Sequence, residues 1–399
     1  MVSPLVRNFA LQKLEDQREK TEKRIAHIII NLAQEMSNRI QPGKYSFDEM
    51  REGLDWFDAE WLNLITCASY AEQDDLCELG DTLLHFMIRR GHLKDCEQIY
   101  KGVLNVRQNQ GDRRGEVKTW NDLGVCKQFQ GNWDTAIDNY RQSIQLQEQL
   151  LNEDTQYTGI DQLPKTYNSL GFVFQEKGDF DKAEEAYQQA LKICEEAKSK
   201  NLSEETRKEI ILELSQTYNN LAWLRTCRIR NNPEKLKEEF GKARKEFEQS
   251  IRIKLDHEDP RLGQTRRRYG ELYLLGKQGR VAQTEFGKAL EDLQEINDEY
   301  ELGLCYKGLG NAAQQQEDWK KAEDAFLNSL KFLRDRDYPI LNGEIHIALA
   351  RVYRVTDLEK ALKEALKALS ILERTDEDSL KDEARKLEED IAKQIESRR

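Results

Sequence analysis

Residues 170–190 read LGFVFQEKGDFDKAEEAYQQA, and this stretch decides the fold. It begins with a leucine–glycine pair, continues with a glycine–aspartate pair, and then places Ala183, Tyr187 and Ala190 at helical spacing. Side chains three and four residues apart share one face of a helix. A glycine–aspartate pair closes one helix with a left-handed residue and starts a turn. The stretch therefore predicts two antiparallel helices, with the aromatic of the second packed against the glycine of the first.

The second half of this pattern recurs along the chain. The seven copies are Cys96/Tyr100/Val103, Ala136/Tyr140/Ser143, Ala183/Tyr187/Ala190, Ala243/Phe247/Ser250, Ala282/Phe286/Ala289, Ala322/Phe326/Ser329 and Ala361/Ala365/Ala368. Their first positions are 40, 47, 60, 39, 40 and 39 residues apart. A repeat of this length indicates stacked helical units that share one continuous core.

Upstream signatures accompany these copies. Leu123-Gly124 precedes Gly131-Asn132-Trp133 as Leu170-Gly171 precedes Gly178-Asp179-Phe180. Over residues 80–373 the pattern resembles the tetratricopeptide repeat, a helix–turn–helix unit. We therefore expect an all-α fold: a right-handed α-solenoid of about seven helix pairs with a period near 40, an N-terminal helical extension and a C-terminal capping helix. The usual repeat has about 34 residues, so the helices are expected to be longer.

Three segments are expected: 1–75 (N-terminal helical segment), 76–373 (repeats) and 374–399 (capping helix). A helical pattern runs from Pro4 to about Ile40, and Pro42-Gly43 interrupts it. A second helix is expected from Ser46 to about Tyr70, with Ser46 and Glu49 as a capping box. The longer spacings between the central copies are assigned to 152–161, 199–205 and 230–237.

Composition excludes several classes of protein. The chain is 34% charged with 6 prolines and a net charge of −12, which favours long amphipathic helices and argues against nucleic-acid binding. No apolar run approaches the ~18 residues of a membrane span, and the start lacks the pattern of a secretory signal. The 7 cysteines sit mostly at small packed positions, so we expect buried thiols and a cytoplasmic protein.

The N-terminal third carries a second resemblance. The segment Pro4–Ala10 is similar to the end of the winged-helix domain of STAND-type (NB-ARC-like) signalling NTPases. Residues 54–64, LDWFDAEWLNL, resemble the start of their helical sensor, and 90–92 and 111–116 are also similar. The sequence has no G-x-x-x-x-G-K-[ST] phosphate loop. The resemblance implies a sensor arm, whose ligand in that family releases an attached NTPase from autoinhibition.

Catalytic and metal-binding patterns are not recognisable. The 5 histidines are scattered, and the acidic helix faces are interleaved with lysines. His92 and Cys96 are four residues apart and could share a zinc ion, but a turn histidine and a packed cysteine explain them better. We therefore expect no enzyme activity, no cofactor and no bound metal.

The resemblance to tetratricopeptide repeats implies that the second, fifth and ninth positions of each first helix line a concave surface. The residues predicted there to bind a partner are Lys118, Asn121, Lys165, Asn168, Phe172, Gln216, Asn219, Trp223, Arg267, Lys307 and Asn311. Gln264, Val125 and Glu271 occupy the remaining positions. The amide of each asparagine offers a donor and an acceptor to a peptide backbone.

The second and fifth positions hold four bases and no acid, which favours a protein or peptide partner with an acidic segment. The alternative for the asparagines and for Trp223 is a structural role in the core. The function expected from the whole pattern is a protein–protein interaction scaffold, the sensing arm of a STAND-type NTPase. A free-standing adaptor or co-chaperone that holds an acidic tail is the alternative, and an enzyme or nucleic-acid regulator finds no support.

Overall fold

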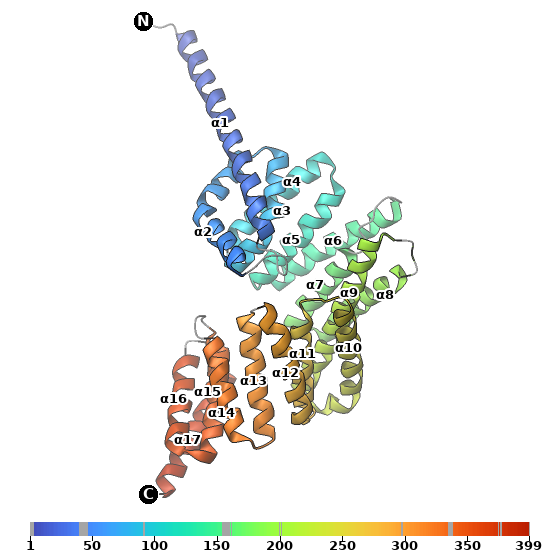
Figure 1. Ribbon diagram of the computed structural model, residues 1–399. Helices are drawn as coiled ribbons and strands as arrows, with labels where there is room; N and C mark the ends of the chain where they lie inside the picture. The colour runs from blue at the N-terminus through green and yellow to red at the C-terminus, as the bar shows by residue number, and fades with distance from the viewer. Residues whose placement is uncertain are drawn as a thin grey trace. The chain divides into compact units, whose positions relative to one another are not determined.

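The structure is a computed structural model that describes residues 4–39, 47–90, 92–153, 160, 162–198, 200, 202–296, 298–333, 338–373, 375 and 377–398. Throughout these ranges the chain is all-α and contains no strand (Figure 1). The chain divides into two compact units, Met1–Leu214 and Ser215–Arg399. No helix in the described part is long and apolar enough to cross a membrane.

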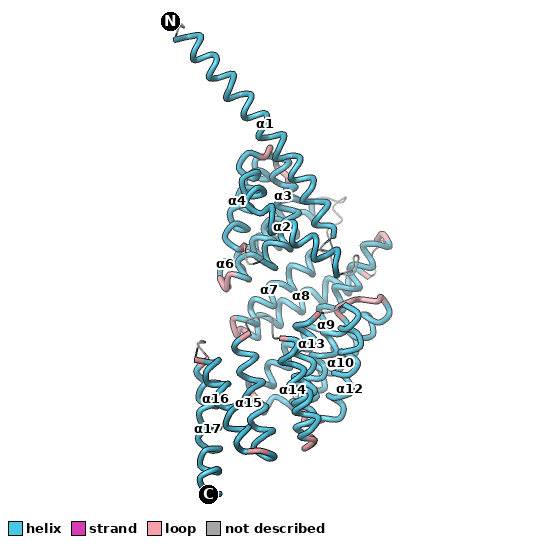
Figure 2. Tube along the Cα trace, turned by 60° about the vertical axis from the view of Figure 1, so that its left-hand side comes forward, coloured by secondary structure: helices cyan, strands magenta, loops and turns pink. Residues whose placement is uncertain are grey.

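The first unit consists of a long helix followed by helix pairs. Its helices are α1 (Pro4–Arg39), α2 (Phe47–Tyr70), α3 (Gln73–Arg90), α4 (Leu93–Gln110), α5 (Arg113–Phe129), α6 (Trp133–Glu153), α7 (Gln162–Glu176), α8 (Phe180–Ala197) and the start of α9 (Glu204–Asn231). The predicted helix from Pro4 is confirmed, and it packs on α2 and α3. Its N-terminal half extends beyond the other helices of this unit (Figures 1 and 2). Pro42, Gly43 and Ser46 lie outside the described residues.

The second unit repeats the helix pair to the C-terminal end. It contains the rest of α9, a short 3-10 helix (Pro233–Lys235), α10 (Leu236–Asp256), α11 (Leu262–Leu275), α12 (Gly279–Ile296), α13 (Glu299–Gln315), α14 (Trp319–Phe332), α15 (Pro339–Thr356), α16 (Leu358–Leu372) and α17 (Asp378–Arg398). From α10 onward, successive helices pack against each other (Figure 2). The predicted helix pairs correspond to α3–α4 through α15–α16, and α17 packs on α16 at the end.

The segment boundaries of the sequence analysis compare with the helices as follows. The boundary between 373 and 374 falls in the connection between α16 and α17, whereas that between 75 and 76 falls within α3. The 60-residue spacing between Ala183 and Ala243 has a different origin from the expected loops. Its longest part is the 28-residue α9, which includes part of both assigned stretches.

Close contact between an aromatic ring and a glycine joins the two helices of a pair. A Cβ atom added to Gly124 would lie 2.6 Å from the ring of Tyr140, and one added to Gly171 would lie 2.5 Å from that of Tyr187. The same contact recurs in the second unit between Gly270 and Phe286 and between Gly310 and Phe326. The rings are buried, so no larger side chain fits at the glycine without displacing the helix.

Left-handed residues end the first helices, as the Gly131-Asn132 and Gly178-Asp179 pairs predict. Gly131 has a φ of 70° and Gly178 a φ of 84°. After Gly178, the amide of Asp179 donates to the carbonyl of Phe174 at 2.8 Å, and this bond closes the last turn of α7. Lys277 and Glu317 adopt the same conformation after α11 and α13, so the turn is retained where the sequence lacks the glycine.

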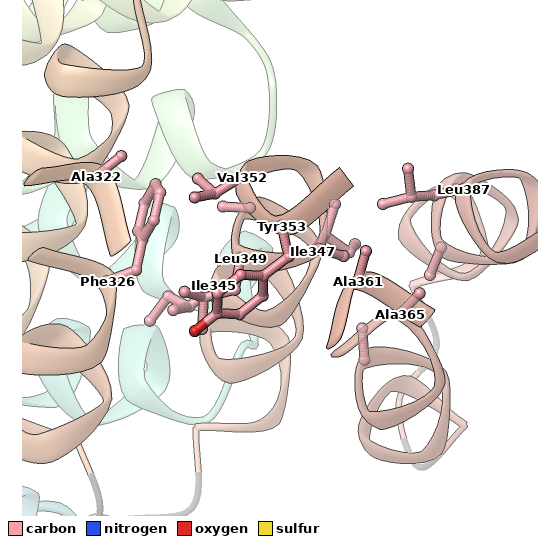
Figure 3. Close-up of a cluster of buried hydrophobic side chains, with 14 of the residues drawn as sticks. Ala322, Phe326, Ile345, Ile347, Leu349, Val352, Tyr353, Ala361, Ala365 and Leu387 are labelled. Carbon is pink, nitrogen blue, oxygen red and sulfur yellow. The ribbon is translucent and has the colours of Figure 1, made fainter. Parts of the chain in front are cut away.

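The apolar core of the second unit is layered between helix pairs. Figure 3 shows Phe326 of α14 beside Ile345 and Leu349 of α15, with Leu387 of α17 on the far side of α16. Phe326, Ile345 and Leu349 are almost fully buried. Neighbouring pairs therefore share one core, as expected for a repeat fold.

The cysteines only partly follow the prediction of free buried thiols. The prediction is wrong for Cys96 and Cys126, which join α4 to α5 in a disulfide with an S–S distance of 1.97 Å. Cys67, Cys194 and Cys305 are buried free thiols. Burial raises the pKa of the Cys194 thiol to about 12, so it stays protonated at neutral pH.

We expect Gly171→Ala to destabilise the chain by about 1–3 kcal/mol, because the added methyl group meets the buried ring of Tyr187. Gly241→Ala in α10 is the matched control, since no atom lies within 4 Å of its added Cβ. Alanine favours a helix interior over glycine, so the control is expected to gain about 0.5–1 kcal/mol. Urea unfolding measures both changes, and equal effects of the two substitutions would contradict the packing.

Candidate partner-binding groove

The second unit contains a groove with a volume of about 970 Å³. Its walls come from α9, α11, α13, α15 and α17, which are the first helices of successive pairs and the final helix. On α13 the residues facing it include Tyr300, Leu304, Lys307 and Asn311, each three or four positions after the last. This spacing keeps them on one face of the helix. First helices therefore present a common surface, as the resemblance implied.

The groove is apolar at one end and mixed in character at the other. Tyr300 and Tyr338 lie near the starts of α13 and α15 with ring centroids 5.1 Å apart, and Leu304, Ile340 and Leu341 also line this end. Ile340 is 41% exposed and adds accessible apolar surface to this end. Toward the ends of the same helices the lining changes to Asn311, Gln314, Gln315 and Arg351, beside Leu274 and Leu275 at the end of α11.

A series of ion pairs, which we call the cross-repeat ladder, connects the first helices. In the second unit its rungs are Arg230–Glu271 (α9 to α11, 2.6 Å), Arg267–Glu301 (α11 to α13), Lys307–Glu344 (α13 to α15) and Arg351–Glu383 (α15 to α17, 2.6 Å). In each rung the base precedes the acid in sequence. The four bases and four acids of the ladder therefore neutralise each other along this wall.

One rung is buried and three are partly exposed. The side chains of Arg267 and Glu301 are each 7% exposed, and Gln264 donates a further hydrogen bond to Glu301 at 3.0 Å. Burial lowers the pKa of Arg267, but Glu271 and Glu301 outweigh it and raise this pKa above its usual value. Burial likewise raises the pKa of Glu301, and Arg267 more than reverses the effect. The pair is therefore fully charged and structural.

Four of the predicted partner-binding residues come together in this groove: Trp223, Arg267, Lys307 and Asn311. Arg230 and Arg268 lie over the ring of Trp223, each 5.1 Å from its centroid. Arg267 lines the groove but is held by its two carboxylates, so little of it faces a ligand. Lys307 and Asn311 are partly exposed.

Gln216 and Asn219, on the part of α9 in the second unit, are not among the lining residues. Gln216 donates to Asn220 at 2.9 Å. Asn219 is fully buried, and its Oδ1 atom finds no hydrogen-bond partner within the described residues. This burial assigns the side chain of Asn219 to the interior of the unit, in line with the structural alternative for the asparagines.

The other predicted residues belong to the first unit. Lys118 is exposed and pairs with Asp81 at 2.8 Å, and Lys165 pairs with Glu209 at 2.7 Å. Asn168 is buried and donates to Glu213 at 3.4 Å, so its amide faces the interior. Asn121 and Phe172 are partly exposed. The three asparagines expected in register therefore do not form one exposed row.

Sequence reasoning placed Glu271 on the concave surface but missed the other three acids of the ladder, Glu301, Glu344 and Glu383, and the apolar end of the groove. Each acid lies 32 to 41 residues after its base, close to one repeat, so the repeat period itself was the available signal. Tyr300, Tyr338 and Ile340 precede the positions that the repeat pattern aligns. They lie at helix starts, where Tyr300 and Ile340 are exposed and Tyr338 is partly buried, and periodicity alone does not separate such residues from core residues.

No cluster of three or more potential metal ligands occurs in the part of the chain that the structure describes. The ring of His92 stacks on Trp61 with centroids 4.1 Å apart, and Cys96 is bonded to Cys126. The zinc alternative for His92 and Cys96 therefore has no support.

Comparison with known proteins agrees with this geometry. The family model of the tetratricopeptide repeat matches residues 164–196, so the chain contains such a repeat. No curated protein matches the sequence.

Three solved structures are similar to the chain. One is a STAND protein with a tetratricopeptide repeat sensor from Pyrococcus horikoshii (15% identity, TM-score 0.55, 82% of this chain and 46% of that one). Another is aspartyl phosphate phosphatase F from Bacillus subtilis (12%, 0.52, 81% and 75%), and a third is the apo form of RapI (12%, 0.51, 95% and 98%). The chain thus spans less than half of the STAND protein. At these identities the likeness shows the fold alone, which is that of tetratricopeptide-repeat solenoids.

We expect Arg267→Met to destabilise the chain by about 3–5 kcal/mol, because it leaves the buried carboxylate of Glu301 without its cation. Arg351→Met removes an exposed rung and is the matched control, with an expected loss of at most about 1 kcal/mol. Chemical unfolding compares the two. Equal losses of unfolding free energy in the two variants would show that burial does not determine how much an ion pair of the ladder contributes to stability.

Asp122 in α5 predicts a pH dependence of stability in the first unit. Its carboxylate is buried, and burial, opposed by Lys118 and reinforced by Asp81, raises its pKa to about 7. The unfolded chain ionises this group near pH 4, so the free energy of unfolding falls as the pH rises from about 4 to about 7. Asp122→Asn is expected to remove this slope, on the order of 4 kcal/mol over the interval. The measurement is the free energy of unfolding at a series of pH values between 4 and 7. The same dependence on pH in the parent chain and in Asp122→Asn would refute the assignment.

Proposed function

We propose that this protein is a non-enzymatic protein-interaction scaffold whose groove in the second unit binds a segment of a partner protein or a peptide. The observation that carries the proposal is the groove itself. It combines about 970 Å³ of space with an exposed apolar end and a second end that carries several polar side chains on neighbouring first helices. Concave sites of this size with a few placed polar groups are where proteins bind ligands.

The partner segment in this proposal carries acidic residues. Lys307 and Arg351 are the bases along the groove that retain exposure on the α13–α15–α17 wall. Carboxylates of a partner would bind them by charge-assisted hydrogen bonds. Asn311 and Gln314 would add contacts to a peptide backbone.

We further propose that the chain acts as the partner-sensing arm of a STAND-type signalling NTPase. The motifs at 4–10 and 54–64, ahead of the repeats, support this assignment, as does the likeness to a STAND protein with a repeat sensor. In this proposal partner binding alters an NTPase module in cis. A free-standing adaptor or co-chaperone would use the same groove without such a module.

We expect Ile340→Glu to abolish capture of the partner, because a charge replaces apolar surface at the end of the groove. The matched control is Leu327→Glu in α14, a similarly exposed leucine (46%) outside the groove. Quantitative mass spectrometry of proteins retained from native lysate by the three immobilised chains is the measurement. Partners must be lost with Ile340→Glu and retained with Leu327→Glu.

Retention of every partner by Ile340→Glu would contradict the use of this groove. Circular dichroism of the variants checks that each remains folded. The sensor role requires in addition that the captured partner change the nucleotide hydrolysis of an NTPase module in cis. A partner that binds the groove without such an effect would favour the adaptor.

A further inference from the structure

We propose that Glu344 and Glu383 are built-in competitors of the ligand: in the free groove they occupy Lys307 and Arg351, and in the complex carboxylates of the ligand replace them. This inference rests on the proposed function and specifies how the same groove is regulated. The acids stand one helix away from their bases, so exchange requires only that two side chains rotate away.

Exposure is the first condition that a rung of the ladder must meet to exchange. The Lys307 and Glu344 side chains are 25% and 37% exposed, and those of Arg351 and Glu383 are 51% and 39% exposed. Ion pairs at such sites contribute little to stability, because water solvates the separated charges well. A released Glu344 or Glu383 therefore returns to solvent at low cost.

The other two rungs do not exchange. Separating Arg267 from Glu301 would leave buried charges uncompensated. Arg230 shares Glu271 with Arg267, so the buried arginine holds that acid in place. The ladder thus divides into a fixed part on α9–α11–α13 and an exchangeable part on α13–α15–α17.

Helix geometry sets the spacing of the ligand carboxylates. Lys307 bonds to Glu344, and Arg351 lies seven residues further along α15, which corresponds to about 10 Å. An extended peptide advances about 3.3 Å per residue, so carboxylates three residues apart span this distance. Ile340 and Leu341 lie about one turn before Glu344, at the apolar end of the groove. An apolar side chain of the ligand would therefore lie at that end.

The ligand that fits is an extended segment with an apolar residue followed by two acidic residues at a separation of three. A test probe is the blocked, fluorescein-labelled hexapeptide Leu-Ser-Asp-Gly-Ser-Asp, together with the reversed sequence, because the groove does not fix the direction of the chain. In the matched probes both aspartates are asparagines. Fluorescence anisotropy measures the affinity of the full chain for each probe.

We expect Glu344→Gln and Glu383→Gln each to increase affinity for the aspartate probe about 2- to 5-fold, the strength of one exposed ion pair. Lys307→Gln is expected to weaken binding of the same probe. Glu238→Gln in α10 is the matched control: it removes the same charge from an acid that pairs with Lys235 and Lys242 outside the groove. It should leave the affinity unchanged, as should Glu344→Gln for the asparagine probe.

Three outcomes would overturn the inference. The first is an affinity for the aspartate probe that is unchanged or lower in both groove variants. The second is an equal gain in Glu238→Gln, which would reflect net charge alone. The third is that neither the parent chain nor any variant binds the aspartate probe in either direction. In each case the capture experiment with Ile340→Glu and Leu327→Glu still decides whether the groove binds a partner.

Discussion

The contact between a glycine of one helix and an aromatic ring of the next sets the packing of four helix pairs, two in each unit. Tyr140 and Tyr187 fill the space above Gly124 and Gly171, and Phe286 and Phe326 do the same above Gly270 and Gly310. Each contact brings the two helices of a pair close together. Within the second unit, this packing leaves successive first helices beside one another. Helices α11, α13, α15 and α17 lie side by side in this order and line the groove.

Charge on the groove wall acts at two levels that differ in burial. The Arg267–Glu301 pair is shielded from water and connects α11 to α13 as part of the structure. Lys307–Glu344 and Arg351–Glu383 face solvent, where an ion pair adds little to stability. These two pairs neutralise each other's charges on the free wall, but they do not hold the helices in place. An apolar end with Tyr300, Tyr338 and Ile340 completes a surface suited to a segment of mixed character.

The repeat pattern predicted the helix pairs, the left-handed turns at Gly131 and Gly178, and the meeting of Trp223, Lys307 and Asn311 in one groove. These features follow from local spacing, which the sequence displays directly. The roles of Asn168, Asn219 and Arg267 could not be predicted, because their burial depends on helix rotation and on acids a repeat away. The Cys96–Cys126 bond escaped prediction for a similar reason: the cysteines are 30 residues apart and meet only when α4 packs on α5.

A double-mutant cycle between Gly171 and Tyr187 tests the central packing contact most directly. The cycle compares the free energies of unfolding of four proteins: the parent chain, Gly171→Ala, Tyr187→Leu and the combined variant. Urea unfolding supplies each value, with a signal that reports on the first unit, where both residues lie. If the ring occupies the space of the missing side chain, Gly171→Ala destabilises the parent chain. In the Tyr187→Leu background the smaller side chain leaves room for the added methyl group, so Gly171→Ala is neutral or stabilising there, with a coupling of at least about 1 kcal/mol. Strict additivity of the two substitutions would contradict the account.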